Sequence, residues 1–351
     1  MKHGLFVSRR VAREVGQRLL DAARAAGMDA ELIEYDSAAL PGAAALGRIS
    51  CALLSIDLLG RSTKTYLEPQ LQTFFDVLRA APNLQWLQVS SAGMDRPVYG
   101  ELRERGVRLS SAAGTNARAV VQTAIAGVLA LARRLPMWME AQREHRWLPM
   151  RGELAPPPLD GQRAVVVGMG QIGIGIGRVL RALDLNVTGV RRSVAPQPGF
   201  DQVVSYDQLN EVLPQTDWLI LACPLTELTE RLVDATRLAL LPPTAHLVNV
   251  ARGEVVDEPA LIKALREGRL AGAYLDVFAE EPLPVSSPLW DMPNVIVSAH
   301  SAGNSTGHHR NVVDLFERNL PRFAAGQELI NEWKIGTDPD PASSAEKGPP
   351  A

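Results

Sequence analysis

The sequence predicts an α/β protein with two doubly wound parallel sheets, and three observations carry this prediction. Its 351 residues correspond to about two domains at roughly 150 residues per domain. Short apolar runs of strand length alternate with longer runs in which apolar residues recur every three or four positions. Such alternation is typical of parallel sheets that carry helices on both faces. A glycine-rich turn over residues 168–173 also joins one apolar run to a helix-like run.

The first series of elements occupies the N-terminal part of the chain. Val11, Val15 and Leu19 fall on one helical face, so a helix is expected over residues 11–26. Apolar runs predict four strands, over residues 5–8, 30–35, 51–56 and 84–89. Together these elements predict the first of the two parallel sheets.

The second series follows a long apolar helix that is expected over residues 117–134. Pro136 is expected to end this helix, because proline lacks the N–H group that the helix ladder needs. An irregular arm is predicted over residues 137–158. Seven strand-like runs then suffice for a complete doubly wound sheet, over residues 164–167, 186–190, 203–205, 218–223, 246–250, 272–277 and 295–298.

The C-terminal part of the chain contains two further segments. Apolar periodicity predicts a final helix over residues 305–325. Residues 337–351 are rich in proline, serine and glycine and contain almost no apolar side chains. Such a composition cannot bury enough apolar surface to fold, so a disordered tail is predicted.

Composition excludes several classes of protein. The net charge is −3, from 36 basic and 39 acidic residues, which argues against a general nucleic-acid-binding protein. The two cysteines, Cys51 and Cys223, are too few for a disulfide framework or a four-cysteine zinc site, and they fit a reducing compartment. The most apolar helical stretch, residues 124–132, is well below the ~18 residues of a membrane span. We therefore expect a soluble cytoplasmic protein without a metal site.

The glycine-rich turn fits the pattern G-x-G-x-x-G and lies between a strand-like and a helix-like run. Gly168 permits the tight turn, Gly170 permits close approach of a pyrophosphate, and Gly173 permits close packing of helix on strand. The N–H groups at the start of the helix, around Gln171 and Ile172, would then face the phosphates. An ordinary glycine-rich strand–helix turn is the alternative to dinucleotide binding.

The residues after the next strand favour one dinucleotide over the other. An acidic residue at the end of that strand would bind the ribose 2′-hydroxyl of NAD and repel a 2′-phosphate. The strand over residues 186–190 is instead followed by Arg191, Arg192 and Ser193. Two guanidinium groups and a hydroxyl suit the 2′-phosphate, so NADP(H) is favoured and NAD(H) stays possible. The alternative is a solvated basic turn that tolerates either cofactor.

Three later stretches carry a resemblance to a known family. They are LVNVARGEVVD at residues 247–257, LDVFAEEPLP at residues 275–284 and VIVSAHSAG at residues 295–303. With the glycine turn, and in this order and spacing, they resemble the D-isomer-specific 2-hydroxyacid dehydrogenases, which include glyoxylate and hydroxypyruvate reductases. SAGMD at residues 91–95 and GTNA at residues 114–117 also look like family motifs. The resemblance extends over nearly the whole chain, to about residue 335.

The resemblance implies that Arg252, Glu281 and His300 form the catalytic triad. Arg252 would bind the carboxylate and the carbonyl of a 2-oxo acid with its fork of donors. His300 would supply the proton to the carbonyl oxygen, and a carboxylate at Glu281 would orient the imidazole. Each residue also has a structural alternative: a surface arginine, a solvated loop acid next to Glu280, and a histidine packed at a strand end.

The resemblance also implies further binding residues. Backbone N–H groups around Ala92 and Gly93 would bind the substrate carboxylate. Asp276 would contact the nicotinamide carboxamide, or it could simply cap its loop. Strand-end residues would line the cofactor cleft: Cys223, Pro224, Thr226, Val250 and Ala251.

The domain layout follows from the same resemblance. A Rossmann cofactor domain over residues 116–301 would be inserted into a discontinuous flavodoxin-like substrate domain, formed by residues 1–115 and 302–336. A homodimer through the cofactor domain is implied. The chain departs from the family pattern at Gln122 and Thr123, where many members have Glu-His. A proline commonly precedes the catalytic histidine, but here the residue is Ala299.

The sequence therefore predicts NADP(H)-dependent reduction of a small 2-oxo acid, of the glyoxylate or hydroxypyruvate type, to the D-2-hydroxy acid. A dinucleotide-sensing binding protein on the same fold is the alternative from another class, because a fold does not imply turnover. An oxidant of formate or phosphite on the same scaffold is a weaker alternative.

Overall fold

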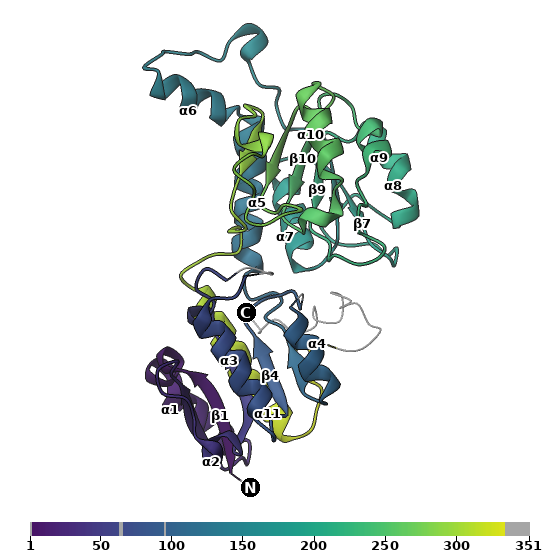
Figure 1. Cartoon of the computed structure of the whole chain (residues 1–351). Coiled ribbons are helices and arrows are strands. Elements are labelled where there is room, and N and C mark those ends of the chain that lie inside the picture. Colours follow the sequence, from purple (N-terminus) through teal and green to yellow (C-terminus); the bar gives the residue numbers. More distant parts are fainter. Residues whose placement is uncertain (1, 63–65, 95, 334–351) are drawn as a thin grey trace. The chain divides into compact units, whose positions relative to one another are not determined.

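The computed structural model describes residues 2–62, 66–94 and 96–333 (Figure 1). The chain divides into two compact units. Met1–Asn116 and Ser305–Ala351 form one, which we call the five-stranded unit, and Ala117–Asn304 form the other, the seven-stranded unit. The expected domain boundaries at residues 115/116 and 301/302 lie within three residues of these divisions. The predicted disordered tail lies outside the described residues.

The sheet of the five-stranded unit is parallel throughout, in the order β2-β1-β3-β4-β5. Its strands are β1 (His3–Ser8), β2 (Ala30–Tyr35), β3 (Ile49–Leu54), β4 (Trp86–Val89) and β5 (Arg108–Ser110). Four of them were predicted from the sequence, whereas β5 is too short to give a periodic signal. This strand order is that of the flavodoxin-like doubly wound fold.

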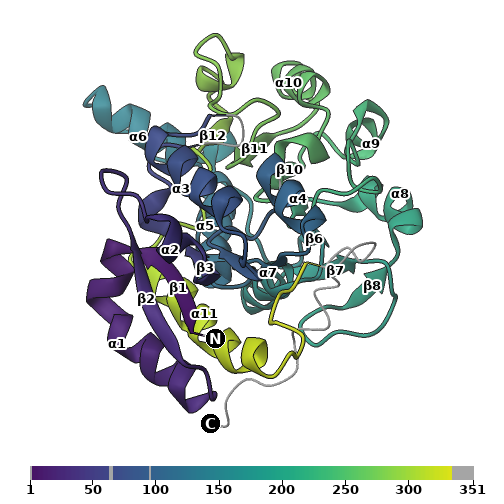
Figure 2. The same cartoon turned by 60° about the horizontal axis from the view of Figure 1, so that its bottom comes forward.

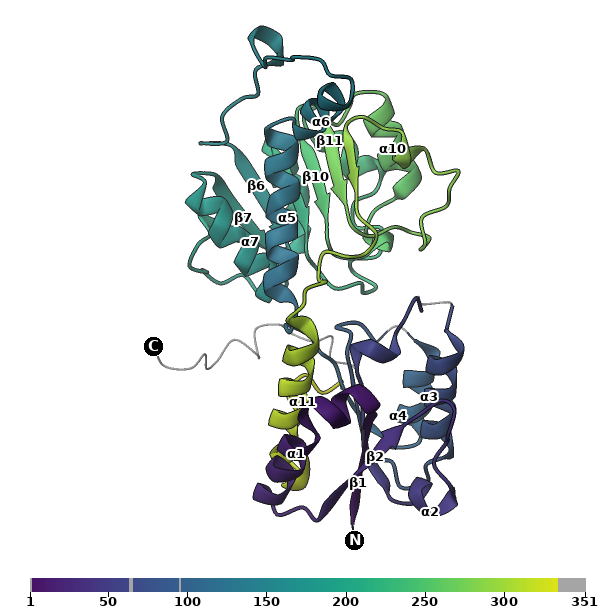
Figure 3. The same cartoon turned by 90° about the vertical axis from the view of Figure 1, so that its left-hand side faces the viewer.

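Helices cover both faces of this sheet because successive strand residues point to opposite sides. Leu5 and Val7 pack with α1 (Arg9–Ala25) and α11 (His308–Ala324), whereas Phe6 packs with α3 (Pro69–Ala80) and α4 (Pro97–Glu104). A short helix, α2, spans Ala43–Leu46, and 3₁₀ turn η1 spans Ile56–Leu58. Although 282 residues lie between the end of α1 and the start of α11, the two helices lie side by side (Figure 3).

The seven-stranded unit contains a second, all-parallel sheet in the order β12-β11-β10-β9-β6-β7-β8. Its strands are β6 (Arg163–Val167), β7 (Asn186–Val190), β8 (Gln202–Val204), β9 (Trp218–Leu221), β10 (His246–Asn249), β11 (Gly272–Leu275) and β12 (Val295–Val297). All seven correspond to predicted apolar runs. The prediction of two doubly wound parallel sheets is therefore confirmed.

The two faces of the larger sheet also carry separate helices. On one face, α5 (Ala117–Ala132) and α7 (Gln171–Ala182) bury Val128 and Ile176 against the strands. On the other face, α8 (Leu209–Val212), α9 (Ala235–Leu240) and α10 (Glu258–Arg266) pack together with loop segments (Figure 2). Short 3₁₀ turns connect several elements: η2 (Gly152–Leu154), η3 (Tyr206–Gln208), η4 (Leu213–Gln215), η5 (Gly253–Val255) and η6 (Pro288–Trp290).

The segment after α5 differs from the prediction in two ways. The helix ends at Ala132, and Arg134 takes a left-handed conformation with φ 56°, so Pro136 does not end it. Pro136 instead lies in the first turn of α6 (Leu135–Arg143), where its missing N–H group costs nothing. The arm is therefore helical in its first part rather than irregular throughout, and α6 turns by 71° from α5 (Figure 1).

The described residues form neither a single membrane-spanning helix nor a cluster of metal ligands. Within the described part of the chain, no single helix is long and apolar enough to cross a membrane. The bent pair α5 and α6 would be long and apolar enough together, by length and composition only, and half of the residues of α5 are buried in the seven-stranded unit. Among the same residues, no group of three or more metal-ligating side chains is close enough together to hold an ion.

Candidate active site

The glycine-rich turn links β6 to α7 and has the backbone geometry that its sequence predicts. Gly168 has φ 93°, in the left-handed region, and a Cβ there would lie 2.5 Å from the Cα of Cys223. A Cβ on Gly173 would lie 1.8 Å from the carbonyl oxygen of Gly168, so helix and turn touch directly. Gly170 is the N-cap of α7 and provides no side-chain cap, which leaves the N–H groups of the first turn available to a ligand. The turn thus fits a pyrophosphate.

Two more glycines continue into α7, and close packing explains them. A Cβ on Gly175 would lie 2.6 Å from Val121 of α5, and one on Gly177 would lie 2.3 Å from the ring of Phe200. Each glycine costs about 1 kcal/mol of helix propensity relative to alanine. Because these two glycines have no side chain, α7 can lie close to Val121 and Phe200.

The side chains of the basic turn after β7 differ in their exposure. Arg191 is partly buried and its Nη2 donates to the carbonyl of Ala195 at 2.8 Å. Its buried Nε has no hydrogen-bond partner among the described residues. Arg192 and Ser193 are exposed. A buried guanidinium N–H without a partner is costly, and an anionic ligand at this turn would satisfy it.

The strand ends expected to line the cofactor site lie at the same edge of the sheet. Cys223 is buried next to the glycine turn, and burial raises the pKa of its thiol to about 12. The loop after it is held by Thr229, whose hydroxyl donates to the carbonyl of Pro224 at 2.6 Å and accepts from the N–H of Thr226 at 2.8 Å. Val250 and Ala251 are buried directly after β10.

Arg252 follows β10 and immediately precedes η5. Its backbone is extended, and the side chain of Asn249 brackets it, bonding the N–H of Ala251 and the carbonyl of Arg252. Nη1 of Arg252 donates to the carbonyl of Ala251 at 2.7 Å. A Cβ on Gly253 would lie 1.9 Å from the carbonyl carbon of Phe278. Only glycine permits this approach, which joins the Arg252 turn to the loop that carries Glu281.

Glu281 and His300 are in direct contact. Nδ1 of His300 lies 2.7 Å from Oε2 of Glu281, and Oε1 of Glu281 accepts from the N–H of Phe278 at 3.1 Å. The side chain of Glu281 is 18% exposed, whereas that of His300 is 46% exposed. The carboxylate is therefore held by the backbone N–H of Phe278, while the more exposed imidazole leaves its other nitrogen, Nε2, available to a ligand. This arrangement can hold a proton at Nε2 and deliver it to a bound acceptor.

Asp276 directly follows β11, and residues of the loop between β12 and α11 donate hydrogen bonds to it. It is 3% exposed, and its carboxylate accepts hydrogen bonds from the hydroxyl of Ser298 and from the N–H groups of Ser301 and Ala302. These contacts fit the alternative named in the sequence analysis, in which the side chain of Asp276 caps a loop. Its predicted contact with the nicotinamide stays a prediction.

Ala92 and Gly93 follow β4 in the five-stranded unit. The turn is closed by the hydroxyl of Ser91, which donates to the carbonyl of Gly93 at 2.8 Å, and the N–H of Ala112 donates to the carbonyl of Ser91. Ala92 is exposed, so its backbone is open to a ligand. Asp95, the last residue of this motif, lies outside the described residues.

Sequence reasoning did not identify two side chains that contact this site. Tyr274 and Ser298 were treated only as strand residues, yet their hydroxyls lie 2.7 Å apart and Ser298 contacts Asp276. A tyrosine in a buried parallel strand was an available signal, since its hydroxyl requires a partner. Thr123, noted only as a departure from the family pattern, directs its hydroxyl to the carbonyls of Ala119 and Ala302.

Comparison with known proteins gives concordant results. Residues 125–302 match the family model of the D-isomer specific 2-hydroxyacid dehydrogenase, NAD binding domain. A glyoxylate reductase of Thermofilum pendens is 32% identical over 274 residues, which cover 75% of this chain and 80% of the relative. A glyoxylate/hydroxypyruvate reductase of Arabidopsis thaliana is 33% identical over 250 residues, covering 71% and 78%.

Solved structures agree over a larger part of the chain. A D-isomer specific 2-hydroxyacid dehydrogenase family protein from Aeromonas salmonicida superimposes with a TM-score of 0.75 at 28% identity, covering 95% of this chain and 99% of that one. A D-isomer specific 2-hydroxyacid dehydrogenase from Xanthobacter autotrophicus, in complex with NADPH and MES, gives 0.72 at 30% identity, covering 95% and 98%.

Proposed function

Because the chain belongs to the D-isomer-specific 2-hydroxyacid dehydrogenase family, we propose that it reduces a small 2-oxo acid to the D-2-hydroxy acid with NADP(H). Glyoxylate and hydroxypyruvate are the proposed substrates, as in the names of its relatives. The observation that carries the proposal is the 2.7 Å contact between His300 and Glu281, in a loop that the close approach of Gly253 to Phe278 joins to Arg252.

Each member of the triad has a separate task in this reaction. A reduced nicotinamide, when bound, supplies the hydride to C2 of the substrate. Arg252 binds the carboxylate and polarises the carbonyl with its planar fork of donors. His300 delivers the proton from Nε2 to the carbonyl oxygen as negative charge develops there. Glu281 accepts the hydrogen bond from Nδ1 of the imidazole and so holds the ring in the orientation that presents Nε2.

The remaining predicted residues are proposed to bind rather than to react. Backbone N–H groups at Ala92 and Gly93 would bind the substrate carboxylate. The cofactor set comprises the glycine turn and the strand ends around it: Gly168, Gly170, Gln171, Ile172, Gly173, Cys223, Pro224, Thr226, Val250, Ala251 and Asp276.

A spectrophotometric assay tests the activity. Purified protein is mixed with NADPH or NADH and with a panel of 2-oxo acids led by glyoxylate and hydroxypyruvate, and loss of nicotinamide absorbance is followed. We expect turnover that is lost in His300→Asn, a residue that tolerates the left-handed backbone at this position, and kept in the control His246→Phe. Tight NADPH binding without turnover across the panel would instead favour the dinucleotide-sensing alternative.

The preference for NADP(H) is a separate proposal and has its own test. It is supported by the absence of an acid directly after β7 and by the buried, unpartnered Nε of Arg191 within the described residues. Replacing Arg191 and Arg192 together by alanine should raise the KM for NADPH about 10- to 100-fold, as expected for the net loss of one charge-assisted hydrogen bond of roughly 1.5–3 kcal/mol. The KM for NADH should change little. An equal loss for both cofactors would contradict the assignment of the 2′-phosphate site.

We also propose a homodimer through the arm of the seven-stranded unit. Trp147 is 95% exposed and Trp138 is 39% exposed, and indole rings exposed to this degree are typical of a surface that a second protein covers. Light scattering of the wild type and of a Trp138→Glu/Trp147→Ser variant tests this: a dimer that becomes a monomer is expected, and an unchanged mass would contradict it. A cytoplasmic location stays a prediction from cysteine content.

A further inference from the structure

His300 has an unusual backbone conformation for a histidine. Its φ is 47°, in the left-handed region, which is unfavourable for a residue with a Cβ. Neither neighbour imposes this conformation through a fixed ring, because they are Ala299 and Ser301. The imidazole nevertheless lies at hydrogen-bonding distance from Glu281. Contacts elsewhere in the loop must therefore hold the backbone of His300.

Asp276 supplies those contacts with both its backbone and its side chain. The N–H of His300 donates to the backbone carbonyl of Asp276 at 2.8 Å. The next two N–H groups, of Ser301 and Ala302, donate to its carboxylate at 2.8 and 3.1 Å. Three successive N–H groups are thus directed at one buried residue. The conformation of the loop depends on how the carboxylate of Asp276 is oriented.

A pair of hydroxyl groups orients that carboxylate. The hydroxyl of Ser298 donates to Oδ1 of Asp276 at 2.5 Å, and an ionised carboxylate can only accept. The single proton of Ser298 is therefore committed to Asp276. The 2.7 Å contact between Ser298 and Tyr274 must then use the proton of the tyrosine. The hydrogen bonds run in one direction, from Tyr274 through Ser298 to Asp276.

The ring of Tyr274, the first residue of this chain of hydrogen bonds (the relay), is held by packing. Tyr274 lies in β11 and is 3% exposed, and its ring packs on α5 where Gly127 leaves room. A Cβ on Gly127 would lie 2.5 Å from Cγ of Tyr274, so a larger residue there would displace the ring. Burial raises the pKa of Tyr274 above its ordinary value. The hydroxyl therefore keeps its proton and remains a donor at neutral pH.

We propose that Tyr274 is a positioning residue for His300, acting through Ser298 and Asp276 to hold the imidazole loop in its left-handed conformation. This inference rests on the proposed function, because it assigns to the loop the task of aiming a proton donor. Tyr274 does not touch the imidazole. The role is distinct from the contact of Glu281, which holds the ring itself, since the relay holds the backbone from which the ring extends.

The first test removes one hydroxyl and keeps the ring. Tyr274→Phe should lower kcat about 10- to 100-fold, because a small misplacement of a catalytic group has effects of this size. The KM for the 2-oxo acid should change less than threefold, since Arg252 is untouched. Ser298→Ala should behave in the same way, and Ser298→Thr, which keeps the hydroxyl, should restore most of kcat.

A matched control separates this role from the loss of any buried tyrosine hydroxyl. Tyr35 is also buried and donates its hydroxyl to the carbonyl of Gln70 in the five-stranded unit, with no link to the His300 loop. Tyr35→Phe should therefore leave kcat unchanged. A comparable loss of kcat in Tyr35→Phe would show that Tyr274→Phe acts through general stability, and it would overturn the proposal.

Amide hydrogen exchange tests the relay without any need for turnover. In Tyr274→Phe, the peptide that contains Ser301 and Ala302 should exchange at least tenfold faster than in wild type, and it should be unchanged in Tyr35→Phe. Unchanged exchange in Tyr274→Phe would overturn the relay. Faster exchange with unaltered kcat would overturn the role for His300. If the wild type turns over no 2-oxo acid, the proposed function fails while exchange still decides whether the relay holds the loop.

Discussion

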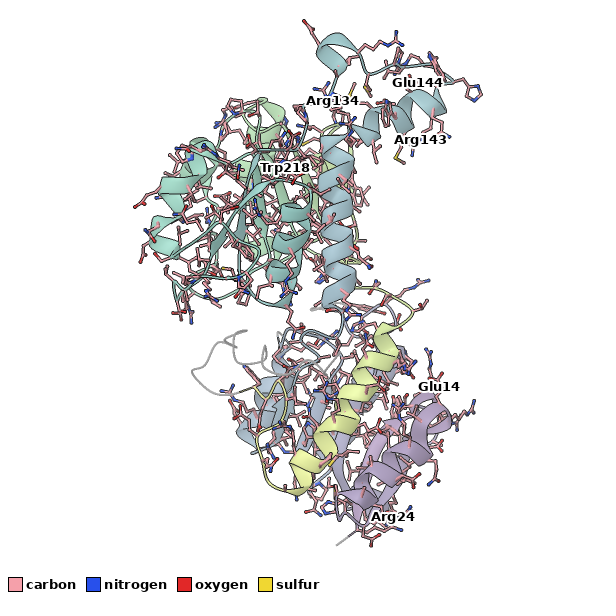
Figure 4. The ribbon with its side chains drawn as sticks, turned by 180° about the vertical axis from the view of Figure 1, so that it is seen from behind. Glu14, Arg24, Arg134, Arg143, Glu144 and Trp218 are labelled. Atoms are coloured by element: carbon pink, nitrogen blue, oxygen red, sulfur yellow. The ribbon has the colours of Figure 1, made fainter. Side chains whose placement is uncertain are left out.

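The two edges of the seven-stranded sheet each carry a histidine, and they treat it in opposite ways. At the amino edge, His246 begins β10 and stacks on the indole of Trp218 at 4.4 Å between ring centroids. At the carboxyl edge, His300 follows β12, is 46% exposed and contacts Glu281. Trp218 and Arg134 lie toward the amino edge, near the end of α5 (Figure 4). Within one sheet, the same residue type is thus structural at one edge and available for chemistry at the other.

The difference is one of environment rather than of residue type. Burial lowers the pKa of His246 to about 4, so this imidazole is neutral at physiological pH. The ring packs flat on an apolar surface, and the indole N–H of Trp218 is bonded to Gln162. His300 has an acid at its Nδ1 and an exposed ring face. Loops at the carboxyl edges of parallel strands carry function because each strand ends there in a turn that is free to vary.

The largest effect that would sharpen this contrast is expected from Glu281→Gln. The amide keeps the size of the side chain, but it can donate to Nδ1 and so favours the wrong tautomer of His300. We expect kcat to fall about 10²- to 10⁴-fold, the usual contribution of a positioned acid–base group. The midpoint of thermal unfolding should move little. A variant with wild-type kcat would remove Glu281 from the mechanism and leave the two histidines without a functional difference.

The next effect is on stability and concerns His246. Its pKa is about 4 in the folded chain and about 6.5 when unfolded. Between these values the unfolded chain binds the proton more readily, so stability is lost as the pH falls from about 6.5 towards 4. His246→Phe removes this group and keeps the stacked ring.

Urea unfolding at pH 7 and pH 4.5 measures the effect. The wild type should lose about 2 kcal/mol more unfolding free energy than His246→Phe between these two pH values. Turnover at pH 7 should be the same in both proteins. An identical pH dependence of stability would mean that His246 titrates normally, and the contrast between the two edges would then be broken.

The smallest effect is expected from a thiol at the carboxyl edge. Cys223 lies beside the glycine turn but is 3% exposed, and burial raises its pKa to about 12. Only about 10⁻⁴ of it is thiolate at pH 8. Iodoacetamide should therefore leave the folded chain unlabelled while it labels both cysteines in urea. Rapid labelling of Cys223 in the folded chain would show that this edge is more open than the structure indicates.

Much of the fold could be predicted because it depends on local patterns. Eleven of the twelve strands in the described part of the chain coincide with apolar runs, and the three-residue β5 was missed because it is too short to show a pattern. The break after α5 was misplaced at Pro136, because the change of direction depends on the left-handed backbone of Arg134. Proline was interpreted as a helix terminator, although it equally well opens the next helix.

The residues of the candidate site could also be predicted from local motifs, whereas the contacts between them could not. Gly168, Arg252, Glu281 and His300 stand in motifs whose residue types suit one kind of chemistry. The 2.7 Å contact between Glu281 and His300 joins residues 19 positions apart, and only the fold brings them together. The relay from Tyr274 to Asp276 could be predicted only in part: a tyrosine in a buried strand indicates that its hydroxyl has a partner, but only the fold shows that this partner is Ser298.

The sequence by itself determined the fold class and the glycine turn, because periodicity and turn chemistry are properties of a short stretch of chain, and its resemblance to a family supplied the candidate catalytic residues. The tertiary structure alone decided which histidine is desolvated against an indole and which is exposed, how Asp276 is oriented, and why His300 can keep a left-handed backbone. These properties depend on burial and on hydrogen bonds between residues from different strands, such as Tyr274 and Ser298. Desolvation and hydrogen-bond geometry exist only once those strands have been brought side by side.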